Sequence, residues 1–305
     1  MPFVQIPELL VAARETCMKT LATCQGSGRN LYAVIDLAAS TDAKHWLSRL
    51  AQTVDAHCLF EQQPEAAATQ HAPWLLRLTP DDRRIGLSHT VDEALVAWNV
   101  SWVESALAPD ALATSLSRRL TARLPEGEAL FRYHDPRLFP GWWGVLSDEE
   151  RACFGAFGAR WWTLSTDDSL QAETLAGEVA DDPFHPPWRI NPAQQQALTR
   201  ASEHQQLVSL LGKRRPEVFL GMGRGEQWHF VRTHDAGAEA HHITHLADRL
   251  RYCELALEHG DDFAEQPRWQ PVWAAMAWGS QRLASALKRL PSEAAASPDI
   301  SGITI

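Results

Sequence analysis

The chain has 305 residues, of which 45% are hydrophobic and 22% are charged, values typical of a folded soluble protein. This length predicts two domains, or one large domain with an appendage, and a core that needs neither disulfides nor metals. Residues 1–165 carry 15 basic and 19 acidic side chains and the rest carry 13 and 19, which gives a net charge of −10. Neither half has the basic excess that a phosphate backbone or an anionic membrane requires, so we expect no nucleic acid or membrane partner.

Cysteine usage and the first residues indicate a cytoplasmic protein. The five cysteines are odd in number and form no C-x-x-C, which argues against a disulfide framework or a zinc ribbon. Residues 1–10 lack the basic start and apolar core of a signal peptide. No stretch approaches the roughly 18 apolar residues of a membrane span.

Strands alternate with helices over residues 1–165, which predicts an α/β lobe with a small sheet flanked by helices. Apolar spacing predicts helices over residues 7–24, 41–54, 112–124 and 147–154. Short apolar or β-branched runs predict strands over residues 31–36, 57–60, 74–78, 94–103, 129–133 and 160–164.

The remaining residues predict a mainly helical second lobe. Residues 166–187 are acidic and then proline-rich, as in a linker. Asn191 and Pro192 then begin a helix that we expect to end at Gly212. Apolar periodicity predicts two more helices, over 243–257 and 272–290, within a helical lobe of residues 188–291. We expect residues 292–305 to be a flexible tail.

The histidines raise the possibility of a metal-dependent hydrolase. His241 and His245 would share a helix face at i, i+4, and Glu239 could supply a carboxylate. The H-E-x-x-H arrangement of zinc hydrolases is absent, so unliganded histidines at a polar helix start are favoured and no cofactor is expected. The glycine-rich Gly221–Gly225 lacks the following helix that a phosphate-binding loop needs, which favours a flexible connection.

Tryptophan is the compositional outlier, with 13 residues and the doublet Trp161–Trp162. Adjacent side chains of a strand point to opposite faces, so this pair needs a sheet that is covered on both sides. Otherwise one indole would face solvent and indicate a partner surface. A covered sheet is the favoured interpretation, and the tryptophan excess favours binding over chemistry.

The segment Phe131–Arg137, FRYHDPR, is the most informative in the chain. If it is a strand, Phe131 and Tyr133 point one way and Arg132 and His134 the other, before an Asp-Pro turn at Asp135. The two arginines flank one aspartate, and Asp36 at another strand end offers a second carboxylate. An internal ion-pair latch is favoured over direct partner contact, because buried charges need pairing.

At these residues the chain resembles the bacterial type VI secretion effector adaptors, or chaperones, that carry the domain of unknown function 4123. The resemblance covers about residues 30–165 and rests on four blocks in a shared order, LYAVID at 31–36, PWLLRL at 73–78, LFRYHDPR at 130–137 and CFGAF at 153–157. The chain departs from the family at two positions: Leu37 stands where these adaptors commonly have a glycine, and Ala156 where they commonly have a proline.

The resemblance implies a non-enzymatic, cytoplasmic adaptor that binds a secreted toxin effector and loads it onto the VgrG spike protein. We expect a monomer when the adaptor is free, and a groove between the lobes that accepts a partner segment. The residues expected to contact a partner or to hold the fold are Tyr32, Asp36, Arg132, Tyr133, Asp135, Pro136, Arg137, Trp161 and Trp162. The alternatives are the metal-dependent hydrolase and an immunity protein that neutralises a toxin.

Overall fold

The computed structural model describes residues 10–24, 28–40, 42–53, 55–61, 63–79, 85–179, 181–277 and 282–290. The chain divides into two compact units, Met1–Ala201 and Ser202–Ile305. The expected start of the first helix at Pro7 and the tail at 292–305 lie outside the described residues.

The first unit is built on a six-stranded sheet in the order β2-β3-β1-β4-β7-β8, in which all neighbouring strands are antiparallel. Its strands are β1 (Asn30–Asp36), β2 (Ala56–Cys58), β3 (Pro73–Leu78), β4 (Val100–Ser105), β7 (Arg160–Leu164) and β8 (Leu170–Thr174). A second sheet pairs β5 (Thr121–Leu124) with β6 (Gly127–Leu130) and β9 (Trp188–Arg189). The prediction of a mixed α/β lobe with a small sheet is confirmed.

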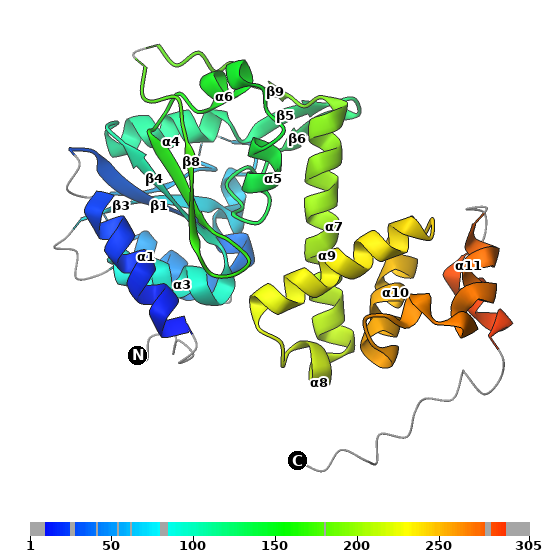
Figure 1. Ribbon diagram of the computed structural model, residues 1–305. Coiled ribbons are helices and arrows are strands. Elements are labelled where there is room, and N and C mark those ends of the chain that lie inside the picture. The colour runs from blue at the N-terminus through cyan, green and yellow to red at the C-terminus, as the bar shows by residue number, and fades with distance from the viewer. Residues whose placement is uncertain are drawn as a thin grey trace. The chain divides into compact units, whose positions relative to one another are not determined.

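Helices cover both faces of the larger sheet. The helices α1 (Val11–Cys24) and α3 (Leu87–Ala97) lie on one face, and α4 (Pro109–Arg118) lies on the other (Figure 1). The remaining helical segments of this unit are α2 (Ala43–Leu50), α5 (Phe139–Trp143), α6 (Asp148–Phe154), η2 (Leu37–Ala39) and η3 (Ala66–His71). Apolar strands such as β1, which is buried from Leu31 to Asp36, are therefore covered on both sides.

Three predicted boundaries in this unit are wrong. The apolar run 94–103 is the end of α3 followed by β4, because Trp98 adopts a left-handed conformation (φ 50°) that ends the helix. The leucine repeat 112–124 is α4 followed by β5. The strand predicted over 129–133 ends at Leu130, and Phe131 N donates instead to Leu120 O at 2.6 Å.

The segment expected to be a linker, residues 166–187, contains the strand β8, which pairs with β7 along its whole length. Asp182 and Phe184 in the same segment contact side chains of the first unit. The division between the units falls instead within α7 (Pro192–Arg214). Asn191 and Gln194 begin this helix with reciprocal side chain–backbone hydrogen bonds of 3.0 and 3.1 Å, which confirms the predicted N-cap.

The second unit is helical and has its own apolar core, which includes Leu207, Phe230, Leu250, Trp269 and Val272. Its helices after α7 are α8 (Pro216–Phe219), α9 (Arg224–Ala240), α10 (Leu246–His259), α11 (Gln270–Met276) and α12 (Leu283–Ala286), with short turns η4 (Phe263–Glu265), η5 (Pro267–Trp269) and η6 (Leu287–Arg289). The helix predicted over 272–290 is therefore at least two segments, and residues 278–281 lie outside the described part. Among the described residues, no helix is both long and apolar enough to cross a membrane.

Candidate functional site

The FRYHDPR segment forms a network of ion pairs with the end of β1. Arg132 Nη2 donates to Asp36 Oδ2 at 2.5 Å and to Asp135 Oδ2 at 3.2 Å. Arg137 holds Asp135 from the other side in a two-bond fork, with distances of 2.7 Å and 2.6 Å. The structure thus brings together four residues that lie up to 101 positions apart in sequence numbering, from Asp36 to Arg137.

Local backbone chemistry places the two carboxylates. Asp36 ends β1, and its Oδ1 accepts from Ala38 N at 3.0 Å, which fixes the η2 turn. Asp135 Oδ1 accepts from Arg137 N at 3.0 Å, so the Asp-Pro sequence with buried Pro136 forms a side-chain-stabilised turn. The Asp135 carbonyl then accepts from Leu138 N and Phe139 N, which leads the chain into α5. These hydrogen-bonded ion pairs therefore form the internal latch that the sequence predicts.

Burial shapes the electrostatics of this ion-pair network. Burial alone would raise the pKa of Asp135, but its hydrogen bonds to Arg137 and the charges of both arginines outweigh this and hold the pKa below its usual value. Burial lowers the pKa of His134, which lies 3.9 Å from Asp36, so this imidazole is neutral near pH 7. Among the described residues, His134 Nδ1 has no hydrogen-bond partner.

One arginine of the network reaches the surface. The Arg132 side chain is 38% exposed, whereas Asp36 is 1% exposed. Only Nη2 of Arg132 has hydrogen-bond partners among the described residues. Arg132 is thus held by two carboxylates while the rest of its guanidinium group stays open to solvent.

The two tyrosines of the motif blocks are core residues. Tyr133 is buried, and its hydroxyl donates to Leu116 O at 2.9 Å. Burial raises the pKa of Tyr133. Tyr32 is buried in β1 and donates to Leu107 O at 2.5 Å. Tyr32 thus ties β1, and Tyr133 ties the turn after β6, to neighbouring backbone, and both side chains are buried inside the first unit.

Trp161 and Trp162 are both buried, on opposite faces of the sheet. Trp161 stacks on Phe139 at a centroid distance of 5.0 Å. Trp162 donates from Nε1 to Glu104 Oε1 at 2.8 Å on the other face. The covered-sheet interpretation is correct, and the alternative of a solvent-facing indole is wrong, so this pair offers no partner surface.

A second buried ion pair was not predicted. Arg119 is completely buried and forms a fork with Asp182, with distances of 2.9 and 2.8 Å. Its guanidinium group also lies over Phe184, 4.4 Å from the ring centroid. The partners are 63 positions apart, and no sequence motif marks either of them.

The metal site that was weighed as an alternative is not formed among the described residues. His241 caps the C-terminus of α9 and His245 caps the N-terminus of α10, so they do not share a helix face. His241 stacks on Trp273 at 4.2 Å, and burial lowers its pKa. Among the described residues, which include Glu239, no group of three or more His, Cys, Asp or Glu side chains is placed to hold a metal ion.

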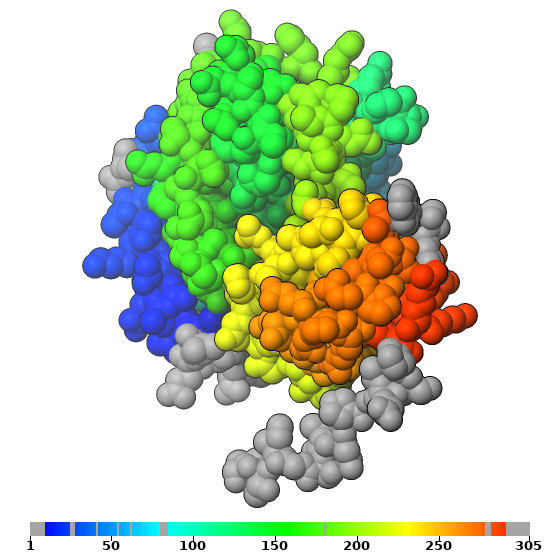
Figure 2. All heavy atoms as spheres, turned by 45° about the vertical axis from the view of Figure 1, so that its right-hand side comes forward, coloured from blue at the N-terminus to red at the C-terminus, as the bar shows by residue number. Residues whose placement is uncertain are grey.

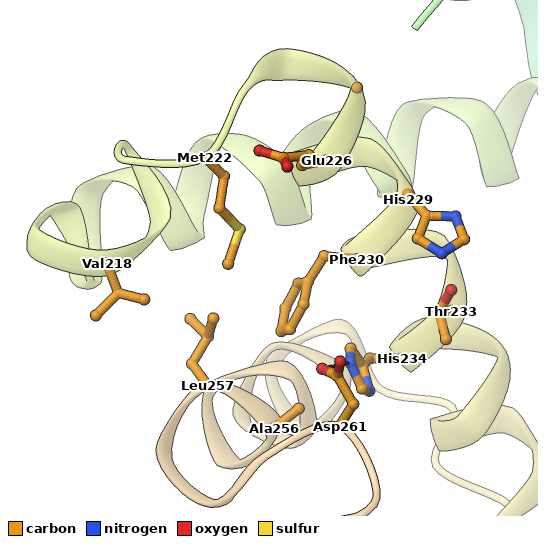
Figure 3. Close-up of a pocket in the computed structure, with 11 residues that line it drawn as sticks. Val218, Met222, Glu226, His229, Phe230, Thr233, His234, Ala256, Leu257 and Asp261 are labelled. Atoms are coloured by element: carbon orange, nitrogen blue, oxygen red, sulfur yellow. Dashed lines mark hydrogen bonds and ion pairs between the residues drawn. The ribbon is translucent and has the colours of Figure 1, made fainter. Parts of the chain in front are cut away.

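Sequence reasoning also missed α9 and the cavity beside it. The helix begins at Arg224, inside the Gly221–Gly225 stretch that was expected to be a flexible connection. Glu226 Oε2 accepts from Gly223 N at 2.8 Å, so the glycine-rich segment is a helix start. Together, α8, α9 and the end of α10 surround a cavity of about 590 Å³ (Figure 3).

The cavity, which we call the α9–α10 pocket, is apolar inside and polar at its rim. Val218, Met222 and Leu257 approach its centre from different sides, and Phe230 points into it (Figure 3). The other lining residues are Gly225, Glu226, His229, Thr233, His234, Ala256 and Asp261. This size falls in the range of about 300–1,000 Å³ that is typical of ligand pockets.

Comparison with known proteins adds one relationship. Residues 31–153 match the family described as Domain of unknown function (DUF4123). This segment runs from the start of β1 into α6 and contains Asp36, the whole FRYHDPR network and Arg119. No curated protein and no solved structure matches the chain.

Proposed function

We propose that the chain is a non-enzymatic adaptor that binds a type VI secretion effector and loads it onto the VgrG spike protein before secretion. The observation that carries the proposal is the match of residues 31–153 to the DUF4123 family. The matched segment holds three of the four blocks on which the resemblance to these adaptors rests, and the start of the fourth.

The contacts of the motif residues support a structural role for them. Asp36 and Asp135 are buried and held by arginines, and Tyr32 and Tyr133 are hydrogen-bonded to backbone. These carboxylates form ion pairs and are poorly placed to exchange protons with a substrate. The motif thereby stabilises a platform, and partner binding is left to surfaces outside its buried part.

Exposed apolar side chains in the second unit support a binding role. Leu220 is 61% exposed. Val218, two residues earlier, is also exposed and lies at the edge of the α9–α10 pocket. Large exposed apolar groups beside a cavity are typical of interaction surfaces. An adaptor needs a specific but releasable interface, for which about 1,600 Å² of total buried area is the standard size.

The test is co-purification of the tagged chain with its cognate VgrG and with the effector encoded beside it, in pairs and as a trio. We expect the chain to retain the effector and, with the effector bound, the spike. Binding to the toxin domain alone, with loss of toxin activity, would replace the adaptor proposal with the immunity protein. Retention of neither partner would overturn the proposal.

A further inference from the structure

The α9–α10 pocket is an apolar groove between two packed helices. The helices α9 (yellow) and α10 (orange) lie against one another in the space-filling view (Figure 2). The floor of the pocket is formed by buried Phe230 and Ala256, and its walls by Val218, Met222 and Leu257. An apolar groove of this kind accepts one face of an amphipathic helix, whose side chains at i, i+3 or i+4, and i+7 fill it.

The charges at the rim have one sign. Glu226 and Asp261 line the pocket, and the described residues that line it include no lysine or arginine. The Glu226 carboxylate accepts only the backbone N–H of Gly223 among the described residues. Asp261 is 86% exposed and lies 3.1 Å from His234 Nε2.

These two carboxylates differ from most others of the second unit. Arginines pair with Glu203, Glu217, Asp235, Asp248, Glu254 and Glu258. Neither Glu226 nor Asp261 has an arginine or lysine partner in the described part of the chain. A cation supplied from outside would therefore complete the charge pairing at the mouth of the pocket.

We infer that the α9–α10 pocket is the docking site for an amphipathic helix of the effector, which inserts apolar side chains and brings a lysine or arginine to the rim that carries Glu226 and Asp261. This inference rests on the proposed adaptor function and names the surface and the chemistry of its partner. Apolar burial supplies affinity, and the paired charges set the register of the bound helix.

The chain's own C-terminal residues do not have this chemistry. Residues 292–305 carry two acidic side chains, Glu293 and Asp299, and no lysine or arginine. Like charges at the rim would oppose their insertion. A separate partner segment that carries a cation fits the rim better.

The experiment uses the full chain and the partner complex obtained by co-purification. Val218→Asp introduces a charge at the pocket wall, and Val145→Asp, in the first unit, is the matched control, because the two valines are 41% and 42% exposed. We expect Val218→Asp to weaken partner binding, measured by titration calorimetry, by about tenfold or more. The control variant should bind as the wild type does, and thermal unfolding should show that both variants are folded.

The charge requirement is tested by the double variant Glu226→Gln, Asp261→Asn. Glutamine keeps the acceptor for Gly223 N, so the start of α9 is retained. We expect slower association and a weaker dependence of the association rate on salt than in the wild type. An unchanged rate and salt dependence would refute the charge pairing.

The occupant is identified by replacing Val218 with the photoreactive p-benzoylphenylalanine in the purified complex and sequencing the crosslinked peptide. A helix with apolar residues at i, i+3 or i+4, and i+7 and a nearby lysine or arginine supports the inference. A crosslink to the spike, to a second copy of the chain, to residues 292–305, or to a peptide without a cation overturns it. If the complex forms and Val218→Asp binds normally, the pocket inference fails and the adaptor function stands. If no complex forms, both fail.

Discussion

Asp36 and Arg119 each carry a buried charge, and the ion-pair partner of each lies closer to the surface. Asp36 is paired with the part-exposed Arg132, and Arg119 with the part-exposed Asp182. A buried charge that loses its partner retains its desolvation cost, so the two pairs should respond strongly to removal of the outer member. Both ion pairs connect segments that are far apart in sequence, and they therefore stabilise the tertiary fold of the first unit.

Arg132→Ala should destabilise the first unit by about 1–3 kcal/mol, measured by urea unfolding. The value lies below that for a fully buried pair because Arg132 is solvent-accessible and Asp135 keeps Arg137. Adding Asp36→Asn to this variant should recover part of the loss, because the unpaired charge is removed. Unchanged stability together with lost partner binding would show that Arg132 contacts the partner directly.

Three carboxylates predict how stability depends on pH. Burial alone would raise the pKa of each of these carboxyl groups. Hydrogen bonds outweigh burial and hold each pKa below its usual value. Asp135 accepts hydrogen bonds from Arg137, Asp182 from Arg119, and Asp235 from His204 and Arg249. The unfolded chain therefore takes up these protons at higher pH than the folded one. The stabilisation is complete above about pH 4 and is lost as the pH falls through the lower folded values.

Asp182→Asn tests this dependence. At pH 7 the variant should lose about 3–5 kcal/mol of unfolding free energy, because Arg119 remains buried without its counter-charge. The difference from the wild type should shrink as the pH is lowered below about 4, because Asp182 takes up its proton first in the unfolded wild type and, at still lower pH, in the folded wild type. Urea unfolding at pH 7, 5, 4 and 3 measures both curves, and a difference that is independent of pH would contradict the assignment.

At the scale of elements, the close packing of α9 on α10 depends on Gly237. A Cβ at this position would lie 2.9 Å from the hydroxyl oxygen of Tyr252, a buried residue of α10. Burial also raises the pKa of Tyr252 to about 12. The two helices that border the α9–α10 pocket therefore contact one another at Gly237 and Tyr252, and a larger side chain at position 237 would clash with the tyrosine.

Gly237→Ala should destabilise the second unit by about 1–3 kcal/mol in the wild type, because the overpacking exceeds the gain in helix propensity. In a Tyr252→Phe background the closest contact is removed, so the same substitution should be nearly neutral or stabilising. Thermal unfolding of the four proteins gives the coupling energy. Equal effects of Gly237→Ala in both backgrounds would show that the contact does not limit the packing.

The elements that the sequence predicts well have a regular pattern and a clear end signal. The strands at 31–36 and 160–164 match β1 and β7 closely. The helix predicted over 243–257 corresponds to α10 (Leu246–His259), which is followed by Gly260 with φ 94°. The helix α9 was missed because its polar side chains and internal Gly237 hide its apolar positions. Its start was nevertheless encoded by Gly223 and by Glu226 three residues later.

Long-range ion pairs were predictable only where a motif marks them. Asp36 and the FRYHDPR segment could be linked in advance, because the segment has two cations for one internal carboxylate and Asp36 follows an apolar strand. Arg119 and Asp182 carry no such signal, because a single arginine after a helix is normally solvated. The α9–α10 pocket depends on how three helices pack, which periodicity does not specify.

At the scale of the whole molecule, each unit has its own core. The apolar cluster that runs from Leu207 to Ala286 lies entirely within the second unit, whereas the aromatic cluster around Trp142, Phe154 and Trp161 lies in the first. The buried ion pairs follow the same division, with Arg119–Asp182 in the first unit and Arg249–Asp235 in the second. Cores with this separation support local unfolding of one unit while the other remains folded.

We therefore expect two separable transitions in calorimetric unfolding of the full chain. Asp182→Asn should lower the temperature of one transition and Gly237→Ala that of the other, because each acts within a single unit. For units of this size, a loss of 1 kcal/mol corresponds to a shift of about 2–8 °C. If either variant shifts both transitions equally, or if one cooperative transition persists in both variants, the two units unfold as one and the assignment of separate cores to separate cooperative units is wrong.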